Sequence, residues 1–204
     1  MWSARRSWLA AAVLVLALAW PAAPGLPRER GESLRGQFLV AESKLTGPNF
    51  GESVVLMIRH DRNGAIGLIV NKPMGEMPLD LLRRGQGLPG GDRNKRMRVH
   101  FGGPVEPGVT HVLHDADFAA DGTLVVGPRV HMSKLAAVLA ALAEGRGPKR
   151  YLITIGYAGW GPGQLEGELA RQDWRVVPAD VGLLFSTDDR EKWRRALEEF
   201  RLDL

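Results

Sequence analysis

The sequence predicts a single α+β or mixed α/β domain, because strand-like and helix-like stretches follow one another without strict alternation. The clearest strand signal is a β-hairpin. Residues 53–60 and 65–71 are apolar runs joined by Asp61-Arg62-Asn63-Gly64, and an Asn-Gly pair supplies the positive φ angles of a tight turn. The clearest helix signal is residues 132–144, whose apolar side chains recur at helical spacing. With 204 residues, the chain is long enough for one domain with a substantial core.

The other strands and helices are predicted from shorter patterns. Both runs of the hairpin are apolar on successive residues, so we expect both faces of the sheet to be covered. Pro73 ends the second run, because proline cannot continue a hydrogen-bonded ladder. Asp188 can cap the last helix, whose inward face would carry Trp193, Leu197 and Phe200. Further strands are expected at residues 37–41, 99–101, 110–114, 123–126, 174–177 and 181–185, and further helices at residues 79–84 and 188–200.

Residues 151–180 form the stretch around which we expect the chain to be arranged. Residues 151–155 are apolar and β-branched, which predicts a strand. The glycines between Gly156 and Gly163 then predict a turn, and Pro162 suits the first position of the helix that follows. A strand, glycine turn and helix can aim backbone N–H groups at an anion, although this pattern alone identifies no ligand.

Residues 1–25 have the three-part pattern of an export signal. Arg5 and Arg6 precede an apolar run over residues 8–20, and small residues follow. The run is short for a membrane span, which needs roughly 20 apolar residues. We therefore expect residues 1–25 to be an export signal, with an N-terminal anchor as the alternative. Residues 26–35 would be a flexible lead-in and residues 36–204 the domain. The expected location is the periplasm or another exported compartment, with the cytoplasm as the alternative.

Composition excludes some classes of site without indicating an activity. Hydrophobic residues make up 45% of the chain and charged residues 25%, which is ordinary for a soluble globular protein. Leaving out Arg5 and Arg6 reduces the 27 basic residues to 25, against 23 acidic ones, so the remaining chain is close to neutral. The sequence contains no cysteine, which excludes disulfides, thiolate metal ligands, a cysteine nucleophile and lipidation at cysteine.

The histidines are interpreted as structural residues. His111 and His114, followed by Asp115, suggest a metal site, but a strand places residues three apart on opposite faces. His131 is expected to begin a helix, and His60 precedes the hairpin turn. The sequence contains neither an HExxH nor a GxSxG motif. We therefore predict no metal site, no cofactor and no catalytic residue.

The region from residue 83 to residue 98 is glycine-rich and basic. Such a cluster would bind nucleic acid or another polyanion, or it would be a solvated loop. No aromatic residue lies within the cluster to stack on a base, and Asp92 interrupts it, so we favour the solvated loop and do not expect nucleic acid as a partner. The basic residues of this region are Arg83, Arg84, Arg93, Lys95, Arg96 and Arg98.

These landmarks together resemble the AlgH/YqgE family of bacterial proteins. The resemblance covers residues 36–200 in one colinear block. It implies a single compact α+β domain, mostly antiparallel sheet with three to four interspersed helices. The family has a regulator label from one bacterial exopolysaccharide system, but no agreed catalytic residues. The matching motifs include Gly36-Gln37-Phe38-Leu39-Val40-Ala41, Arg59-His60-Asp61-Arg62-Asn63-Gly64, Asn71-Lys72-Pro73, Phe101-Gly102-Gly103-Pro104, Gly156-Tyr157-Ala158-Gly159-Trp160, Gly163-Gln164-Leu165-Glu166 and Pro178-Ala179-Asp180.

We interpret the chain as a non-enzymatic binding or regulatory protein whose ligand is an unknown protein or small molecule. The first alternative is an enzyme acting on a small anionic ligand, with His60, His114 or Glu168 transferring protons. The second alternative is nucleic-acid binding through the loop of residues 83–98. No membrane span is expected in the mature domain.

The candidate binding patch combines three segments that end strands with glycine or proline. We expect the turn of residues 156–163 to lie beside the other two segments, which are residues 71–73 and 102–104. The alternative is that the glycines serve only close packing and that Trp160 is a core anchor. The predicted patch consists of Asn71, Lys72, Pro73, Gly102, Gly103, Pro104, Gly156, Tyr157, Gly159, Trp160 and Gln164.

Overall fold

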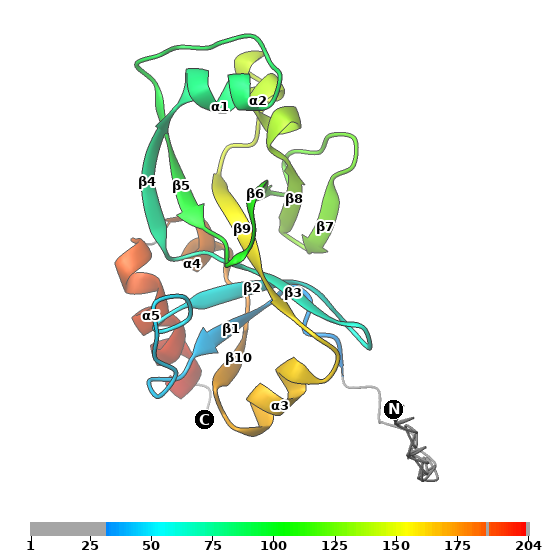
Figure 1. Cartoon of the computed structure of the whole chain (residues 1–204), viewed down its shortest axis with the longest axis vertical. Helices are drawn as coiled ribbons and strands as arrows, with labels where there is room; N and C mark the ends of the chain where they lie inside the picture. The colour runs from blue at the N-terminus through cyan, green and yellow to red at the C-terminus, as the bar shows by residue number, and fades with distance from the viewer. Residues whose placement is uncertain (1–31, 187, 203–204) are drawn as a thin grey trace, which may run out of the picture. The chain divides into compact units, whose positions relative to one another are not determined.

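A computed structural model of the protein describes residues 32–186 and 188–202, and it describes residues 199–202 without their side chains. Strand β9 lies at the centre of this structure (Figure 1). Residues 1–25, where the export signal is predicted, lie outside the described residues, as do residues 26–31 of the expected lead-in. The strands are β1 (Gln37–Ala41), β2 (Val54–Asp61), β3 (Gly64–Ile69), β4 (Pro73–Pro78), β5 (Arg96–Phe101), β6 (Val105–Asp115), β7 (Leu124–Gly127), β8 (Val130–Lys134), β9 (Tyr151–Trp160) and β10 (Trp174–Pro178). The helices are α1 (Leu79–Gly85), α2 (Leu135–Ala143), α3 (Gln164–Ala170), α4 (Val181–Ser186) and α5 (Asp189–Leu202).

The strands form one sheet in which neighbouring strands are almost all antiparallel. Its order is β10-β1-β2-β3-β9-β6-β8-β7, and β5 joins β4 to β9 at the side. The pairing of β5 with β9 is parallel, and the other pairings are antiparallel. The prediction of a mostly antiparallel α+β domain is therefore confirmed. The described residues contain five helices, where three to four were expected.

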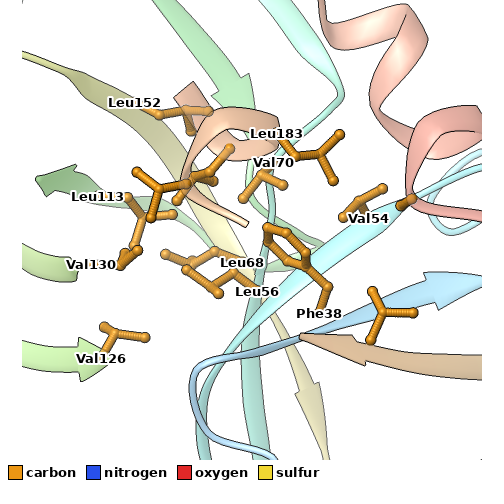
Figure 2. Packing of buried hydrophobic residues seen from close by; sticks show 14 of the residues in the cluster. Phe38, Val54, Leu56, Leu68, Val70, Leu113, Val126, Val130, Leu152 and Leu183 are labelled. Carbon is orange, nitrogen blue, oxygen red and sulfur yellow. The ribbon is translucent and has the colours of Figure 1, made fainter. Parts of the chain in front are cut away.

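The predicted hairpin is the β2–β3 pair, with Asp61 opposite Gly64. The Asp61 carboxylate accepts a hydrogen bond from the Asn63 N–H at 2.7 Å, which is a side-chain contact typical of a tight turn. The expectation of a sheet covered on both faces is also confirmed. Alternate residues of β1 and β2 enter two different hydrophobic clusters, so Phe38 and Leu56 pack on one face while Leu39 and Val55 pack on the other. Figure 2 shows the first of these clusters.

Strand β9 is longer than the sequence predicted, and this changes the role of its glycines. The strand continues to Trp160, so Gly156 and Gly159 lie within it and the turn comes later, at residues 161–163. Gly156 has a φ angle of 72°, and a Cβ there would lie 2.3 Å from the Gly103 carbonyl oxygen. A Cβ on Gly103 would lie 2.1 Å from the Tyr157 carbonyl carbon. The glycines therefore let the backbone at Gly102-Gly103 cross the backbone of β9 in direct contact. The sequence pattern predicts only a turn for the glycines of β9.

Two predicted elements near the C-terminal half have a different structure. The helix expected at residues 132–144 begins only at Leu135, because Val130–Lys134 is strand β8, which pairs with β6 and places His131 opposite His114. The strand expected at residues 181–185 is helix α4. The Asp180 carboxylate accepts the Leu183 N–H at 2.6 Å and its carbonyl accepts the Leu184 N–H at 3.0 Å, which starts a helical turn. A five-residue apolar run is compatible with either element.

Strand β4 lies where the sequence predicts no element, and helix α5 lies at residues 189–202, close to the helix predicted at residues 188–200. Among the described residues, β4 pairs with β5 alone, and its prolines are tolerated because it lies at an edge. Asp188 caps α5 by accepting the Arg190 N–H at 2.9 Å. Trp193 and Leu197 pack against the first core cluster, while the Phe200 side chain lies outside the described atoms. No helix in the described part of the chain is long and apolar enough to cross a membrane.

Replacing Gly103 by alanine is expected to destabilise the domain by more than about 3 kcal/mol, because the added methyl group overlaps the backbone of β9 and backbone cannot rotate away. Gly108→Ala is the matched control, since a Cβ there has no atom within 4 Å and the residue lies in the neighbouring strand β6. Urea unfolding of the purified variants measures both. Equal stability of Gly103→Ala and Gly108→Ala would contradict the crossing as a constraint.

Candidate functional site

The structure brings part of the predicted patch together around the backbone crossing. The Phe101 N–H donates to the Lys72 carbonyl at 2.8 Å, and the Gly102 carbonyl accepts the Ile69 N–H at 2.9 Å. The Gly102 N–H donates to the Ile155 carbonyl at 2.8 Å. Segment 102–104 therefore adjoins β9 at Gly156 and Tyr157, and segment 71–73 adjoins Phe101 next to it, with Pro73 opening β4 and Pro104 exposed just before β6.

The other members of the patch lie at the far end of β9. Trp160 is opposite Ala65 and Gly159 is opposite Ile66, next to the hairpin. Trp160 is only 6% exposed and belongs to the second core cluster, and its indole N–H donates to Glu168 at 2.8 Å. The Gln164 side chain accepts the Gly161 N–H at 3.1 Å and donates to Glu168 at 2.9 Å. Trp160 is thus packed as a core residue, away from residues 71–73.

The polar side chains of the patch are used to hold loops against the sheet. Asn71 accepts the Val54 N–H and donates to the Glu52 carbonyl, both at 2.8 Å. The Lys72 ammonium donates to the Pro48 carbonyl at 2.8 Å, and burial lowers the pKa of Lys72 despite the opposing charge of Glu52. The hydrogen bond from Val54 is half-buried and the other two are exposed, and all three use these side chains to hold residues 48–54.

The Tyr157 hydroxyl, the last polar group of the patch, donates to Glu106 at 3.1 Å, and this hydrogen bond raises the pKa of Tyr157. The Tyr157 ring also packs edge-on against His111, with ring centroids 6.5 Å apart. The hydroxyl already has a carboxylate partner, so Tyr157 acts mainly as a contact between β9 and β6.

His114 and His131 lie side by side with ring centroids 6.0 Å apart, and the other histidines make contacts of their own. His114 is fully buried, and its Nε2 lies 2.9 Å from the Ser133 hydroxyl. Burial lowers the pKa values of both His111 and His114. His60 accepts the Leu34 N–H at 3.2 Å through Nδ1. No group of three or more His, Cys, Asp or Glu side chains within the described ranges is placed to hold a metal ion.

The basic region divides into two parts. Its loop is folded around Asp80, which pairs with Arg84 at 3.0 Å, lies 4.0 Å from Arg93 and accepts the Gly91 N–H at 3.1 Å. Arg83 donates to the carbonyls of Pro89 and Leu139, each at 2.9 Å. Arg96 and Arg98 are not in this loop, because they are exposed residues of strand β5.

Arg96 and Arg98 instead line a cavity of about 320 Å³ with residues from three other elements. Arg96, Arg98 and His100 alternate along β5 and so share a face of the strand. Strand β9 and helices α4 and α5 supply the remaining walls. We call this cavity the arginine pocket; it is lined by Arg96, Met97, Arg98, His100, Tyr151, Leu152, Leu184, Phe185, Asp189 and Lys192.

A buried charged cluster forms one wall of the arginine pocket. The Asp189 carboxylate lies 3.0 Å from His100 Nε2, 2.8 Å from the Lys192 ammonium and 3.6 Å from the Arg98 guanidinium. Lys192 is 2% exposed and also donates to the Val70 carbonyl at 2.9 Å. Burial raises the pKa of Asp189, but hydrogen bonds from His100 and Lys192 outweigh it and bring the value down to about 2. Burial lowers the pKa of Lys192, and the hydrogen bond and negative charge of Asp189 offset part of this decrease.

The pocket has more positive than negative groups. Asp189 is the single carboxylate in its lining, which also contains the basic groups of Lys192, Arg96 and Arg98. Arg96 makes no ion pair or side-chain hydrogen bond within the described residues, and the Arg98 side chain is 61% exposed. His100 Nδ1 lies 3.3 Å from the Ile153 carbonyl and Nε2 faces Asp189, so a protonated imidazole can donate to both acceptors. The arrangement is suited to attract and hold an anion.

Sequence reasoning missed most of this pocket. The sequence places Arg96 and Arg98 in a basic loop, whereas the structure places them on strand β5. Asp189 and Lys192 are two polar residues of a surface-like helix, and no motif connects them with His100, which is 89 residues away from Asp189. The alternation of charged and apolar residues in Arg96-Met97-Arg98-Val99 was the available signal of a strand with a basic face.

The fold defines the chain as an α+β protein built on one mostly antiparallel sheet. The chain belongs to the AlgH-like family (DUF179), whose model matches residues 38–204. A UPF0301 protein of Methylococcus capsulatus is 40% identical over 181 residues, covering 89% of this chain and 98% of that protein. A UPF0301 protein of Cereibacter sphaeroides is 39% identical over 171 residues, covering 83% and 93% respectively. These matches confirm the family resemblance read from the motifs.

Solved structures agree with this assignment. The solution structure of the AlgH protein from Pseudomonas aeruginosa has a TM-score of 0.69 and 33% identity, and the match covers 88% of this chain and 94% of that one. A crystal structure of a protein from Corynebacterium diphtheriae has a TM-score of 0.62 at 22% identity, over 82% of this chain and 89% of that one, and this likeness concerns the fold alone.

Asp189→Asn is expected to lower the free energy of unfolding by about 3–5 kcal/mol at pH 7, because the change leaves the Lys192 ammonium buried without a counter-charge. The exposed Glu191→Gln, which removes a charge two residues away, should cost less than about 1 kcal/mol. Urea unfolding checks both values. A loss below 1 kcal/mol for Asp189→Asn would show that this ion pair does not hold α5 in place.

The lowered pKa of Asp189 predicts that the free energy of unfolding depends on pH. The pKa of Asp189 is lowered from 3.8 to about 2 on folding, so its contribution to stability is complete above pH 3.8 and is lost as the pH falls towards 2. The parent protein should lose stability over this window more steeply than Asp189→Asn does. Unfolding measured between pH 5 and pH 2 tests this, and parallel curves for the two proteins would contradict it.

Proposed function

We propose that the protein is a non-catalytic binding protein whose ligand is a small anion held in the arginine pocket. One observation supports this proposal most directly: Arg96, which has no ion pair within the described residues, shares a cavity with Arg98 and Lys192, and Asp189 is the one carboxylate there. A guanidinium presents a planar fork of donors that matches a carboxylate or phosphate group. Two such forks at one cavity favour an anion with at least two oxygens.

The volume of the arginine pocket and the hydrogen bonds of its lining residues support a small ligand and a binding role. A volume of about 320 Å³ is at the lower end of the range of small-molecule sites. Both ring nitrogens of His100 lie within hydrogen-bond distance of acceptor oxygens of the protein, so the ring is held by the protein and is not free to turn towards a ligand. Tyr151 stays neutral because burial raises its pKa, so it can offer a hydroxyl but no charge. These features favour recognition over the alternative of an enzyme.

The contacts of the arginines in the loop of residues 83–95 argue against the alternative of nucleic-acid binding. Arg84 and Arg93 are turned towards Asp80, and Arg83 bonds backbone carbonyls, so these side chains do not form a continuous basic track. A polyanion would need such a track, whereas a single small anion needs only the two arginines of β5.

Thermal unfolding with inorganic pyrophosphate and with citrate tests the pocket. Either anion should raise the melting temperature in a concentration-dependent way, since a ligand that binds only the folded state stabilises it. The double variant Arg96→Ala, Arg98→Ala should lose at least about tenfold in affinity, because charge-assisted hydrogen bonds contribute on the order of 1.5–3 kcal/mol each.

Arg93→Ala, Lys95→Ala is the matched control, because it removes the same charge from the adjacent loop. Binding should be unchanged in this control at 0.15 M salt. An equal loss in both double variants would point to general attraction of anions by the basic region, and no stabilisation by either anion would contradict the pocket as a site for such ligands.

We also propose that the protein is exported, on the pattern of residues 1–25 alone. Protein recovered from fractionated cells should be in the exported fraction and should lack residues 1–25. N-terminal sequencing of that fraction checks this expectation. Cytoplasmic protein that begins with Met1 would contradict it.

A further inference from the structure

A second cavity lies between β7 and the ends of β2 and β3, in a different part of the sheet from the arginine pocket. Its volume is about 410 Å³. Strand β7 is the last strand in the sheet order, and β2 and β3 are three or more positions away, so curling of the sheet brings them together. We call this cavity the hairpin cleft; it is lined by Ser33, Arg35, Ile58, Arg59, His60, Ile66 and Leu124.

The floor of the hairpin cleft is a continuation of the hydrophobic core. Ile58 is 6% exposed and belongs to the first core cluster, and Ile66 packs against that cluster. On the opposite wall Leu124 is 37% exposed, and its neighbour Val125 is 54% exposed. Val126, the next residue of β7, is buried in the same cluster and is labelled in Figure 2. Apolar surface therefore runs from the core to solvent, and covering it would be favourable.

The rim of the cleft is cationic. Arg35 is exposed and its side chain makes no hydrogen bond or ion pair in the described part of the chain. The Arg59 side chain is 54% exposed and lies 3.6 Å from Asp61, a long, single contact of low strength. His60 is fixed beneath them, since its Nδ1 accepts the Leu34 N–H and its Nε2 lies 3.5 Å from Glu166. Two guanidinium groups thus stand over an apolar floor, with Asp61 and Glu166 as the nearby acidic groups.

We propose that the hairpin cleft binds a single-chain amphiphile with an anionic headgroup, such as a medium-chain fatty acid. The apolar chain would lie against Ile58, Ile66 and Leu124, and the carboxylate would meet Arg35 and Arg59 at the rim. Charge complementarity selects this ligand over a cationic amphiphile, and the apolar floor selects it over a simple anion.

The test uses calorimetric titration of the full chain with octanoate, decanoate and dodecanoate below their micellar concentrations. The dissociation constant should fall by about fourfold for each added methylene that enters the cleft. Decyltrimethylammonium, which has a similar chain and the opposite charge, should bind at least tenfold more weakly than decanoate. Equal binding of both, or an affinity that does not change with chain length, would overturn the proposal.

A matched pair of variants locates the site. Leu124→Asp places a carboxylate in the cleft at a position 37% exposed, and Val109→Asp makes the same change at a position 38% exposed outside the cleft lining. Leu124→Asp should weaken decanoate binding at least tenfold, while Val109→Asp should leave it unchanged. The double variant Arg96→Ala, Arg98→Ala should bind decanoate like the parent protein. Equal affinity in the two Asp variants, or loss of decanoate binding in the arginine-pocket variant, would show that the cleft is not the site.

Discussion

The close crossing of two backbones, at Gly102-Gly103 and at Gly156-Tyr157, is the constraint on which the rest of the structure depends. At this point β9 stops pairing with β5 and β6 and continues as the partner of β3. A single strand thereby serves two groups of strands, as Figure 1 shows for β9 at the centre of the sheet. The crossing has no room for a Cβ on either side, since added atoms would lie between 2.1 and 2.3 Å from backbone atoms. Because backbone is rigid compared with side chains, this contact fixes the path of the sheet.

The arginine pocket is a consequence of this path. Strand β5 runs parallel to β9 and ends at the crossing, which places His100 two residues before it. Helix α5 comes from the other side, held by the Trp193 indole on the Ala41 carbonyl at 2.7 Å and by Lys192 on the Val70 carbonyl. Asp189 then bridges α5 to β5 through His100. The Asp189 carboxylate, with His100, Lys192 and Arg98 around it, holds α5 against β5. The basic groups outnumber this carboxylate, so the contact that orients α5 also leaves positive charge in the arginine pocket.

The two cavities differ in chemistry, and this difference follows from which layer of the sheet each one meets. The arginine pocket opens beside a strand that alternates charged and apolar residues, so charge lines it. The hairpin cleft opens onto the inner face of the curled sheet, so core residues line it and charge appears only at its rim. Membership in the AlgH-like family establishes the fold and leaves the ligand open. A binding role with separate polar and apolar sites is consistent with a domain whose histidines are all engaged in packing or hydrogen bonds.

The sequence by itself determined the features that depend on residues close together in the chain. Asn63-Gly64 fixed the hairpin, the successive apolar residues of β2 and β3 required cover on both faces, and the order of motifs identified the family. Tertiary structure decided the rest. The same glycines that predict a turn can permit a backbone crossing, and only the partner at Gly103 distinguishes the two. The apolar run of α4 became helical because Asp180 caps it. The arginine pocket joins residues from β5, β9, α4 and α5, and contacts between residues so distant in the chain leave no periodic pattern from which they could be predicted.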